Sequence, residues 1–131
     1  MTPDSQTWEA LASAAQRACR HAYAPYSHFH VGAAVLTDDG QIFAGCNVEN
    51  ASYGLTICAE RSAAFAAVCG SPAPPVLAAV YVTSDPPVAA SPCGACRQVL
   101  AQFGNPLVSF EAEGGRVVVP LSELLPLAFS R

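Results

Sequence analysis

Three cysteines and one glutamate in this chain have types and spacing that could hold a metal ion and move protons. Cys93 and Cys96 lie three residues apart in Pro-Cys-Gly-Ala-Cys, and Cys58 begins the tripeptide Cys-Ala-Glu that ends at Glu60. Two cysteines three apart at the start of a helix present their sulfurs on one side, where the helix dipole favours the metal-binding thiolate. With Cys58 as a third ligand, a zinc ion keeps one tetrahedral position for water, which is the pattern of a catalytic site.

The short distance from Cys58 to Glu60 suggests separate roles for the metal and the carboxylate. Two residues beyond the proposed ligand, Glu60 is close enough to hydrogen-bond a water on the metal without binding the metal itself. Such a carboxylate can take a proton from water and return it to a leaving group, which is general acid–base catalysis. A lone Cys-x-x-Cys also occurs in redox sites and zinc ribbons, but its combination with the upstream Cys-Ala-Glu is much more specific.

The elements that must position these residues can be predicted from apolar periodicity and turn residues. Strands are expected over residues 31–36, 41–46, 76–83, 107–110 and 116–119. Helices are expected over about 3–21, 57–69, 93–103 and 122–125. Thr2 is the expected N-cap of the first helix, with Pro3 at its first position. The first two strands are joined by Asp38-Asp39-Gly40, a turn typical of a hairpin.

This order of elements predicts an α/β fold in which a five-stranded mixed sheet has helices on both faces, a three-layer α/β/α sandwich. At this length a single domain is expected to span residues 1–131. Cys58 and Cys93 both follow strands, at or just beyond their carboxyl ends, where ligands usually bind in open α/β sheets. The proposed metal site therefore falls where this fold would place a ligand.

The composition limits the kinds of partner. The chain has a formal net charge of −4, no lysine and six dispersed arginines, whereas polynucleotide binding relies on neutralising several phosphates. No nucleic-acid partner is expected, and a neutral or weakly charged small molecule is favoured as the substrate. No apolar run reaches the roughly 18 residues of a membrane helix, and the first residues do not resemble an export signal. A cytoplasmic location is expected, where cysteines stay reduced rather than forming a disulfide scaffold.

Several segments resemble the cytidine deaminase family in its short homotetrameric form. They are Ala-Pro-Tyr-Ser-His-Phe at 24–29, Val-Gly-Ala-Ala at 31–34, Gly-Cys-Asn-Val-Glu-Asn-Ala at 45–51, Cys-Ala-Glu-Arg at 58–61, Pro-Cys-Gly-Ala-Cys-Arg-Gln at 92–98 and Glu-Leu-Leu-Pro at 123–126. Zinc nucleobase deaminases carry this glutamate and this Pro-Cys-x-x-Cys signature. The resemblance implies one Zn²⁺ per chain and hydrolysis of cytidine and 2′-deoxycytidine to uridine and 2′-deoxyuridine, with release of ammonia, in pyrimidine salvage.

The resemblance also implies roles for individual residues. It makes Cys58, Cys93 and Cys96 the metal ligands and Glu60 the group that moves protons. The implied substrate contacts are Phe29 on the pyrimidine ring, Asn47 and Glu49 on the ribose, and Tyr53 and Phe129 from neighbouring subunits of a homotetramer whose active sites are shared. The backbone N–H of Ala59, at a helix start, could bind the base carbonyl. Without the cysteine motifs, Asn47 to Glu49 would be an ordinary polar turn and Phe29 a core residue.

A site with three thiolates raises a physical difficulty. With Zn²⁺ they carry a formal charge of −1, which should make a bound water less acidic than a histidine-rich site would. Arg61 and Arg97 each lie next to a proposed ligand and could offset this charge by donating charge-assisted hydrogen bonds to the sulfurs.

The other histidines and cysteines are expected outside the site. His21, His28 and His30 are not at metal-ligand spacing with any cysteine pair, and Cys19, Cys46 and Cys69 are most simply buried apolar residues. Cys46 remains open as a fourth zinc ligand, because it ends a strand close to the proposed pocket. A fourth cysteine ligand would leave no position for water and would make the metal site structural.

Two further functions fit parts of the sequence. A structural zinc domain would have four protein ligands, Cys46 included, but it gives Glu60 and the Asn47/Glu49 pair no role. A deaminase of an aminonucleoside antibiotic shares the zinc motif and a similar length, and the Asn47/Glu49 pair favours cytidine over such a substrate. A polynucleotide-editing deaminase is disfavoured by the acidic charge balance.

Overall fold

The strands form a single sheet in the order β2-β1-β3-β4-β5 in the computed structural model, which describes residues 2–131. In chain order they are β1 (His30–Thr37), β2 (Ile42–Cys46), β3 (Leu77–Asp85), β4 (Leu107–Ala112) and β5 (Gly115–Pro120). β1 is antiparallel to both β2 and β3, β3 and β4 are parallel, and β5 is antiparallel to β4. The predicted five-stranded mixed sheet is confirmed.

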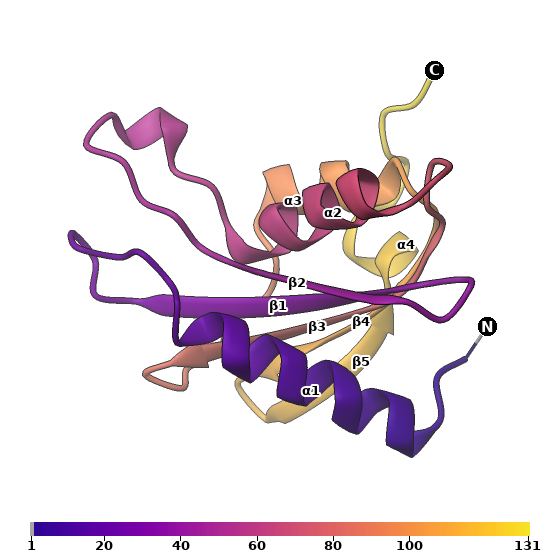
Figure 1. Ribbon diagram of the computed structural model, residues 1–131, viewed down its shortest axis with the longest axis horizontal. Coiled ribbons are helices and arrows are strands. Elements are labelled where there is room, and N and C mark those ends of the chain that lie inside the picture. The colour runs from indigo at the N-terminus through magenta and orange to yellow at the C-terminus, as the bar shows by residue number, and fades with distance from the viewer. Residues whose placement is uncertain (1) are drawn as a thin grey trace.

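Helices cover both faces of this sheet (Figure 1). Helix α1 (Ser5–Cys19) packs on one face, while α2 (Ala59–Gly70) packs on the other with α3 (Gly94–Ala101) beside it. The two shorter helices are η1 (Tyr53–Leu55), a 3-10 helix, and α4 (Leu121–Leu124), which contacts α3 and β5. The three-layer α/β/α sandwich and its single domain are therefore confirmed. None of the helices that the structure describes is long and apolar enough to cross a membrane.

Strand β1 shows why both faces need a helical layer. Ala33 and Val35 belong to the apolar cluster under α2, whereas Ala34 and Leu36 belong to the cluster under α1. Successive side chains of a strand point to opposite faces, and all four of these are buried. An apolar run without alternation is the pattern expected of a strand covered on both sides.

The start of α1 differs from the prediction. The helix begins at Ser5, because the Asp4 side chain accepts a hydrogen bond from the Thr7 backbone N–H at 2.8 Å and so caps it. Thr2 is therefore not the N-cap. Both residue types are good caps, so the sequence alone left the exact start open.

The start of α2 differs in a way that matters for function. The helix begins at Ala59 rather than at residue 57, because Cys58 keeps an extended backbone as the N-cap and makes no side-chain capping hydrogen bond. Its sulfur is therefore free for other contacts. Residues 53–55, for which no helix or strand was predicted, form η1. Every other predicted boundary lies within two residues of the observed one.

Helix α2 lies very close to β2 near the helix start. A Cβ placed on Gly45 would lie 2.5 Å from the backbone nitrogen of Ala63 and 2.6 Å from the Cβ of Ser62. No larger residue fits there unless the helix moves away from the strand. Because Cys58 caps this same helix, the contact at Gly45 also fixes where the sulfur of Cys58 lies.

The carboxyl ends of β2 and β3 meet at one edge of the sheet, on either side of the beginning of β1. Gly32 of β1 pairs with Cys46 of β2 and with Thr83 of β3. The chain that leaves β2 leads to Cys58 at the start of α2, and the chain that leaves β3 leads to Cys93 at the start of α3. Both helix starts thus follow the strand ends at which ligands bind in open α/β sheets.

Candidate metal centre and active site

Three cysteines from two helix N-termini come together in this structure. Cys58 and Cys93 are the N-caps of α2 and α3, and Cys96 lies buried in the first turn of α3. Their sulfur atoms all lie within 4.8 Å of one another, and the sulfurs of Cys58 and Cys93 are 3.7 Å apart. Because helix N-termini favour negative charge, both helices stabilise thiolates here.

This donor set fits one zinc ion per chain. Tetrahedral Zn–S bonds of about 2.3 Å hold two sulfur atoms about 3.8 Å apart, which agrees with the separation of Cys58 and Cys93. Across residues 2–131 the three cysteines form the one cluster of metal-ligating side chains that was found. Three protein ligands leave a tetrahedral zinc ion one position for a water or a substrate atom.

Arg61 faces the cluster from the first turn of α2. Its Nη2 lies 3.4 Å from the sulfur of Cys58 and donates to it. Hydrogen bonds from the Cys96 thiol and from Arg61 lower the pKa of Cys58 to about 5. The same hydrogen bond to Cys58, together with burial, raises the pKa of Cys96. Cys58 is therefore a thiolate more readily than Cys96, and metal binding must displace the proton of Cys96.

Glu60 lies in the first turn of α2 and lines the same cavity as Cys58 and Cys93. The residue is only 5 % exposed, and this burial raises the pKa of its carboxyl group to about 7. A carboxyl group that titrates near neutral pH can both accept and return a proton, which is the property required of a general acid–base catalyst.

The cavity beside the sulfurs has a volume of about 260 Å³. Of the residues selected from the sequence, it is lined by Phe29, Asn47, Cys58, Ala59, Glu60 and Cys93. Sequence reasoning missed the remaining lining residues, which are Val31, Thr56, Ile57, Val82, Ala89, Ala90 and Ser91. These are small or apolar side chains. Five of them lie within four residues of Cys58 or Cys93 in the chain and Val31 lies two residues after Phe29, whereas Val82 has no such neighbour in the sequence.

Asn47 connects the cavity to the loop before β1. Its Nδ2 donates to the carbonyl oxygen of Phe29 at 2.8 Å, and its Oδ1 accepts the backbone N–H of Val31 at 2.9 Å. The side chain is 8 % exposed and spans both sides of residue 30. Its second amide hydrogen and second lone pair are left for a further partner.

Glu49 holds the same loop further from the cavity. Its Oε1 accepts the backbone N–H groups of Tyr26 at 2.9 Å and Ser27 at 3.2 Å, and its Oε2 accepts the Ser27 hydroxyl. The hydroxyl of Ser27, together with these backbone donors, lowers the pKa of Glu49. Glu49 is not among the residues that line the cavity.

Tyr53 and Phe129 lie on the surface of the single chain. They are 82 % and 73 % exposed, and the cavity beside the sulfurs is lined by neither of them. The structure therefore does not bring them into the site of their own chain, and their predicted role in the site of a neighbouring subunit stays a prediction.

Arg97 differs from the prediction that it would donate to a ligand sulfur. Its Nε donates to the carbonyl oxygen of Pro92 at 2.8 Å, and its Nη1 donates to that of Leu124 at 2.7 Å. Adjacent residues of a helix do not face each other, so following Cys96 directly does not place Arg97 beside that sulfur. The guanidinium instead ties the residue before Cys93 to α4.

Cys46 points away from the metal ligands. Gly45 faces α2, so the next residue of the strand points to the face covered by α1. The described cluster contains Cys58, Cys93 and Cys96 without Cys46. The four-cysteine structural site that was kept open on sequence grounds thus lacks its fourth ligand. Cys19 is buried as predicted, whereas Cys69 is exposed, contrary to prediction.

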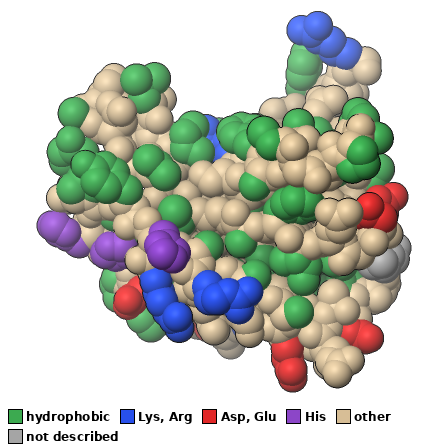
Figure 2. Space-filling model, viewed as in Figure 1, with side chains coloured by type: hydrophobic (Ala, Val, Ile, Leu, Met, Phe, Trp, Pro, Cys, Tyr) green, Lys and Arg blue, Asp and Glu red, His purple; other side chains and the backbone are tan. Residues whose placement is uncertain are grey.

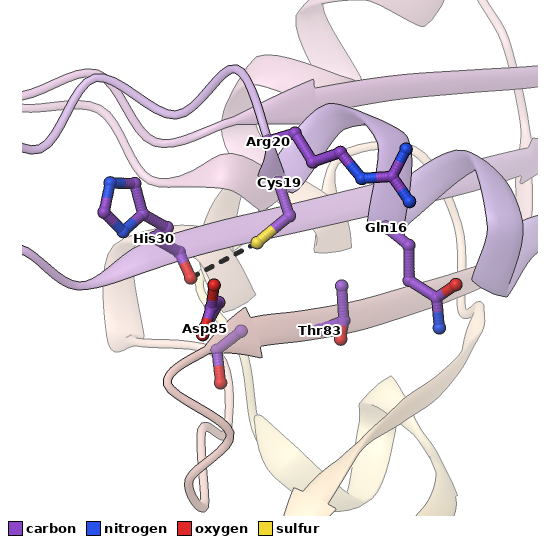
Figure 3. Close-up of a pocket in the computed structure, with 7 residues that line it drawn as sticks. Gln16, Cys19, Arg20, His30, Thr83 and Asp85 are labelled. Carbon is purple, nitrogen blue, oxygen red and sulfur yellow. Dashed lines mark hydrogen bonds between the residues drawn. The ribbon is translucent and has the colours of Figure 1, made fainter.

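A second cavity, of about 460 Å³, lies at the end of α1 (Figure 3). It is lined by Gln16, Cys19, Arg20, His30, Thr83, Ser84 and Asp85. The Cys19 sulfur lies 3.5 Å from the carbonyl oxygen of His30, and burial raises the pKa of this thiol. A thiol that stays protonated is a weak nucleophile and a weak metal ligand. The smaller cavity, which is lined by Cys58, Cys93 and Glu60, is therefore the candidate active site.

The fold and the site together define a class of α/β/α metalloenzyme in which two helix N-termini hold one zinc ion beside a buried acid. Residues 5–112 match the zinc-binding region of cytidine and deoxycytidylate deaminases. The chain belongs to this family and is a hydrolytic deaminase. This is the family whose motifs the sequence resembles.

Individual relatives agree with this membership. The cytidine deaminase of Sporosarcina psychrophila is 44 % identical over 126 residues, which cover 94 % of this chain and 91 % of that protein. The crystal structure of cytidine deaminase from Burkholderia pseudomallei matches with a TM-score of 0.83 at 48 % identity, covering 92 % of this chain and 98 % of that one. A more distant relative, blasticidin-S deaminase of Bacillus cereus, is 31 % identical over 109 residues and covers 78 % of each protein.

Proposed function

We propose that this protein hydrolyses cytidine and 2′-deoxycytidine to uridine and 2′-deoxyuridine, releasing ammonia, as a step of pyrimidine salvage. The observation that carries the proposal is that the buried carboxyl group of Glu60 lines one cavity with Cys58 and Cys93, two members of the three-cysteine cluster. The higher identity to a cytidine deaminase, 44 %, than to blasticidin-S deaminase, 31 %, supports cytidine as the substrate.

The proposed chemistry divides between the metal and Glu60. Zinc, when bound, supplies a Lewis acid that lowers the pKa of a water toward neutrality. Glu60 takes a proton from the attacking water and delivers it to ring atom N3. It then takes a second proton from the hydroxyl group formed at C4 and passes it to the 4-amino group, which departs as ammonia. The buried carboxyl group, with its pKa near 7, is suited to each of these transfers because neither of its forms is strongly favoured at neutral pH.

The proposed substrate contacts use groups on three segments. Phe29 packs on the pyrimidine ring, the backbone N–H of Ala59 binds the base carbonyl, and Asn47 with Glu49 binds the ribose hydroxyls. Phe29, Asn47 and Ala59 line the cavity, which supports their part. Asn47 offers both a donor and an acceptor, and Glu49 offers acceptors only, a combination that suits hydroxyl groups.

We further propose that the enzyme is a homotetramer whose active sites are shared between subunits. Support comes from large apolar side chains left exposed on the single chain, namely Tyr53, Leu55, Phe65, Val68, Leu127 and Phe129. Hydrophobic side chains gather over the loop before α2 and over α2 itself in Figure 2. Exposed apolar side chains that gather in this way favour a protein interface.

The proposal includes a cytoplasmic location and a free nucleoside rather than a nucleic acid as partner. All six cysteines are free thiols, the form that a reducing compartment maintains. The formal net charge of −4 disfavours binding of a polynucleotide, because such binding relies on neutralising several phosphates.

The decisive experiment follows the absorbance of cytidine incubated with the purified, zinc-loaded protein. We expect cytidine and 2′-deoxycytidine to be consumed, uridine or 2′-deoxyuridine and ammonia to appear in equal amounts, and a chelator to stop the reaction. Blasticidin S serves as the competing substrate in the same assay. Turnover of blasticidin S without turnover of cytidine would overturn the proposed substrate, and turnover undiminished after complete removal of zinc would overturn the proposed chemistry.

A further inference from the structure

The loop of residues 26–29, which carries Phe29 into the cavity, and the start of β1 are held by side chains from the segment after β2. Asn47 bonds to the carbonyl oxygen of Phe29 and to the N–H of Val31, at 2.8 and 2.9 Å. Glu49 bonds to the backbone N–H of Tyr26 at 2.9 Å. Two residues proposed to bind the sugar therefore also determine where the ring-packing residue lies.

Ser27 connects the Glu49 carboxylate with the backbone of Phe29 through one hydroxyl group. Its Oγ donates to Oε2 of Glu49 and accepts the backbone N–H of Phe29 at 3.0 Å. Its own backbone N–H donates to Oε1 of the same carboxylate at 3.2 Å. The hydroxyl thus contacts both the proposed sugar-binding carboxylate and the backbone of the proposed ring-packing residue.

The loop needs such a support because of its backbone. His28, between Ser27 and Phe29, has a φ of +57°, a left-handed conformation that is disfavoured for residues other than glycine and persists only where surrounding contacts hold it. The Ser27 hydroxyl bridges this residue, since it contacts Glu49 on one side and the Phe29 N–H on the other. Removing the hydroxyl leaves the carboxylate and the aromatic residue without a direct link.

We propose that Ser27 is a positioning residue for the nucleoside: its hydroxyl sets the orientation of the Glu49 carboxylate and the place of Phe29 as one unit. The inference rests on the proposed function and names a residue that touches neither the metal ligands nor Glu60. Ser27 is exposed in the chain, so its replacement removes no core contact and should leave the fold intact.

The kinetic test compares Ser27→Ala with Ser27→Thr, which keeps a hydroxyl, and with Ser13→Ala, an exposed serine on the far helix α1. Loss of one hydrogen bond should raise KM for cytidine about 3- to 10-fold. Because the sugar and the ring face bind in the ground state as well as in the transition state, kcat should stay within about twofold. Ser27→Thr should restore most of the affinity, and Ser13→Ala should behave as the wild type.

A double-mutant cycle with Glu49→Gln tests whether Ser27 acts through the carboxylate. We expect the double variant to bind cytidine about as weakly as Glu49→Gln alone, because residues that share one contact are not additive. An unchanged KM in Ser27→Ala, a loss confined to kcat, or full additivity with Glu49→Gln would each overturn the proposal.

A readout that does not depend on turnover separates this proposal from the proposed function. Amide hydrogen exchange at Phe29 should be several-fold faster in Ser27→Ala than in the wild type, and Ser27→Thr should restore protection, because the hydroxyl accepts that N–H. If the wild type fails to deaminate cytidine but Phe29 exchange responds in this way, the substrate assignment fails and the link through Ser27 stands. Unchanged exchange at Phe29 overturns the link itself, even in an active deaminase.

Discussion

At the scale of single residues, a substitution of Glu60 can separate proton transfer from metal binding. The carboxyl group is buried, lines the cavity and is not one of the clustered metal donors. Glu60→Gln keeps the size of the side chain and removes its ability to move a proton, so kcat should fall by about 10²- to 10⁴-fold or more. Steady-state kinetics with cytidine measures this loss, and elemental analysis should find one zinc per chain in wild type and variant alike.

The control for this prediction is Cys96→Ala, which removes a ligand and should lose zinc together with activity. If Glu60→Gln kept ordinary turnover, the carboxyl group would have no part in the chemistry. If it lost zinc as Cys96→Ala does, Glu60 would have to be counted among the groups that hold the metal.

Arg61 belongs to the same scale, because it acts on one sulfur. Its Nη2 donates to Cys58 at 3.4 Å, and this contact helps to lower the pKa of that thiol. Arg61→Ala should therefore weaken zinc binding by about 10- to 100-fold, the usual effect of removing a partner of a metal ligand. Competition with a chelator at equilibrium measures the change. Arg61→Lys keeps the charge but not the planar guanidinium, so its zinc affinity should lie between those of the wild type and Arg61→Ala. Unaltered zinc affinity in Arg61→Ala would contradict the argument.

Much of the site could be predicted from residue types alone, and the exceptions have physical reasons. The clustering of Cys58, Cys93 and Cys96 was expected from the combination of Cys-Ala-Glu with Pro-Cys-Gly-Ala-Cys. The substrate contacts were predicted only through the family resemblance. The contacts of Arg97 could not be predicted, because two carbonyl oxygens distant in the chain accept its N–H groups. Ser27 gave no signal either, since a serine after a proline-containing turn is ordinary until the fold brings Glu49 against it.

At the scale of elements, the position of α2 on β2 determines the metal site. Gly45→Ala adds a methyl group that would lie 2.5 Å from the Ala63 backbone nitrogen. Such overpacking should cost about 1–3 kcal/mol of unfolding free energy and should weaken zinc binding, because Cys58 moves with the helix it caps. Urea unfolding at a fixed free zinc concentration measures the first effect, and chelator competition measures the second.

A matched glycine makes this prediction specific. Gly114 lies in the turn between β4 and β5, with nothing within 4 Å of a Cβ placed on it. Gly114→Ala should change stability by less than about 0.5 kcal/mol, as surface substitutions usually do, and should leave zinc affinity unaltered. Equal effects of the two substitutions would mean that the close approach of α2 to β2 does not position Cys58.

The apolar periodicity of the sequence predicts the helices and strands, but not which face of the sheet each side chain takes. Strands, helices and their order followed from apolar periodicity, because this sheet is covered on both faces and its strands are correspondingly apolar. Which face Cys46 takes could not be read from the sequence, since one residue of register reverses every side chain. The contact of Gly45 with α2, and the pairing of Cys46 with Gly32 on the face that α1 covers, show that Cys46 points to the other side.

At the scale of the whole molecule, the single chain leaves two predicted substrate contacts outside its own cavity. Tyr53 and Phe129 are largely exposed, whereas Glu60 is buried beside the metal ligands. If neighbouring subunits complete each site, sedimentation should give a particle of about four times the 13.5 kDa mass of one chain. Two variants that are each impaired in a different part of the site should also regain activity when their subunits are mixed.

Two inactive or impaired variants test this directly. Glu60→Gln chains keep Phe129, and Phe129→Ala chains keep Glu60, so a mixed oligomer contains some sites with both residues intact. Co-expressed chains should therefore recover a substantial fraction of wild-type activity, well above the sum of the two variants alone. Mixing Glu60→Gln with Cys96→Ala is the control, because Glu60 and Cys96 belong to one chain's site and no mixed site can combine them. Recovery in the control would point to exchange of chain segments between subunits, and no recovery in the Phe129 pair would confine each active site to a single chain.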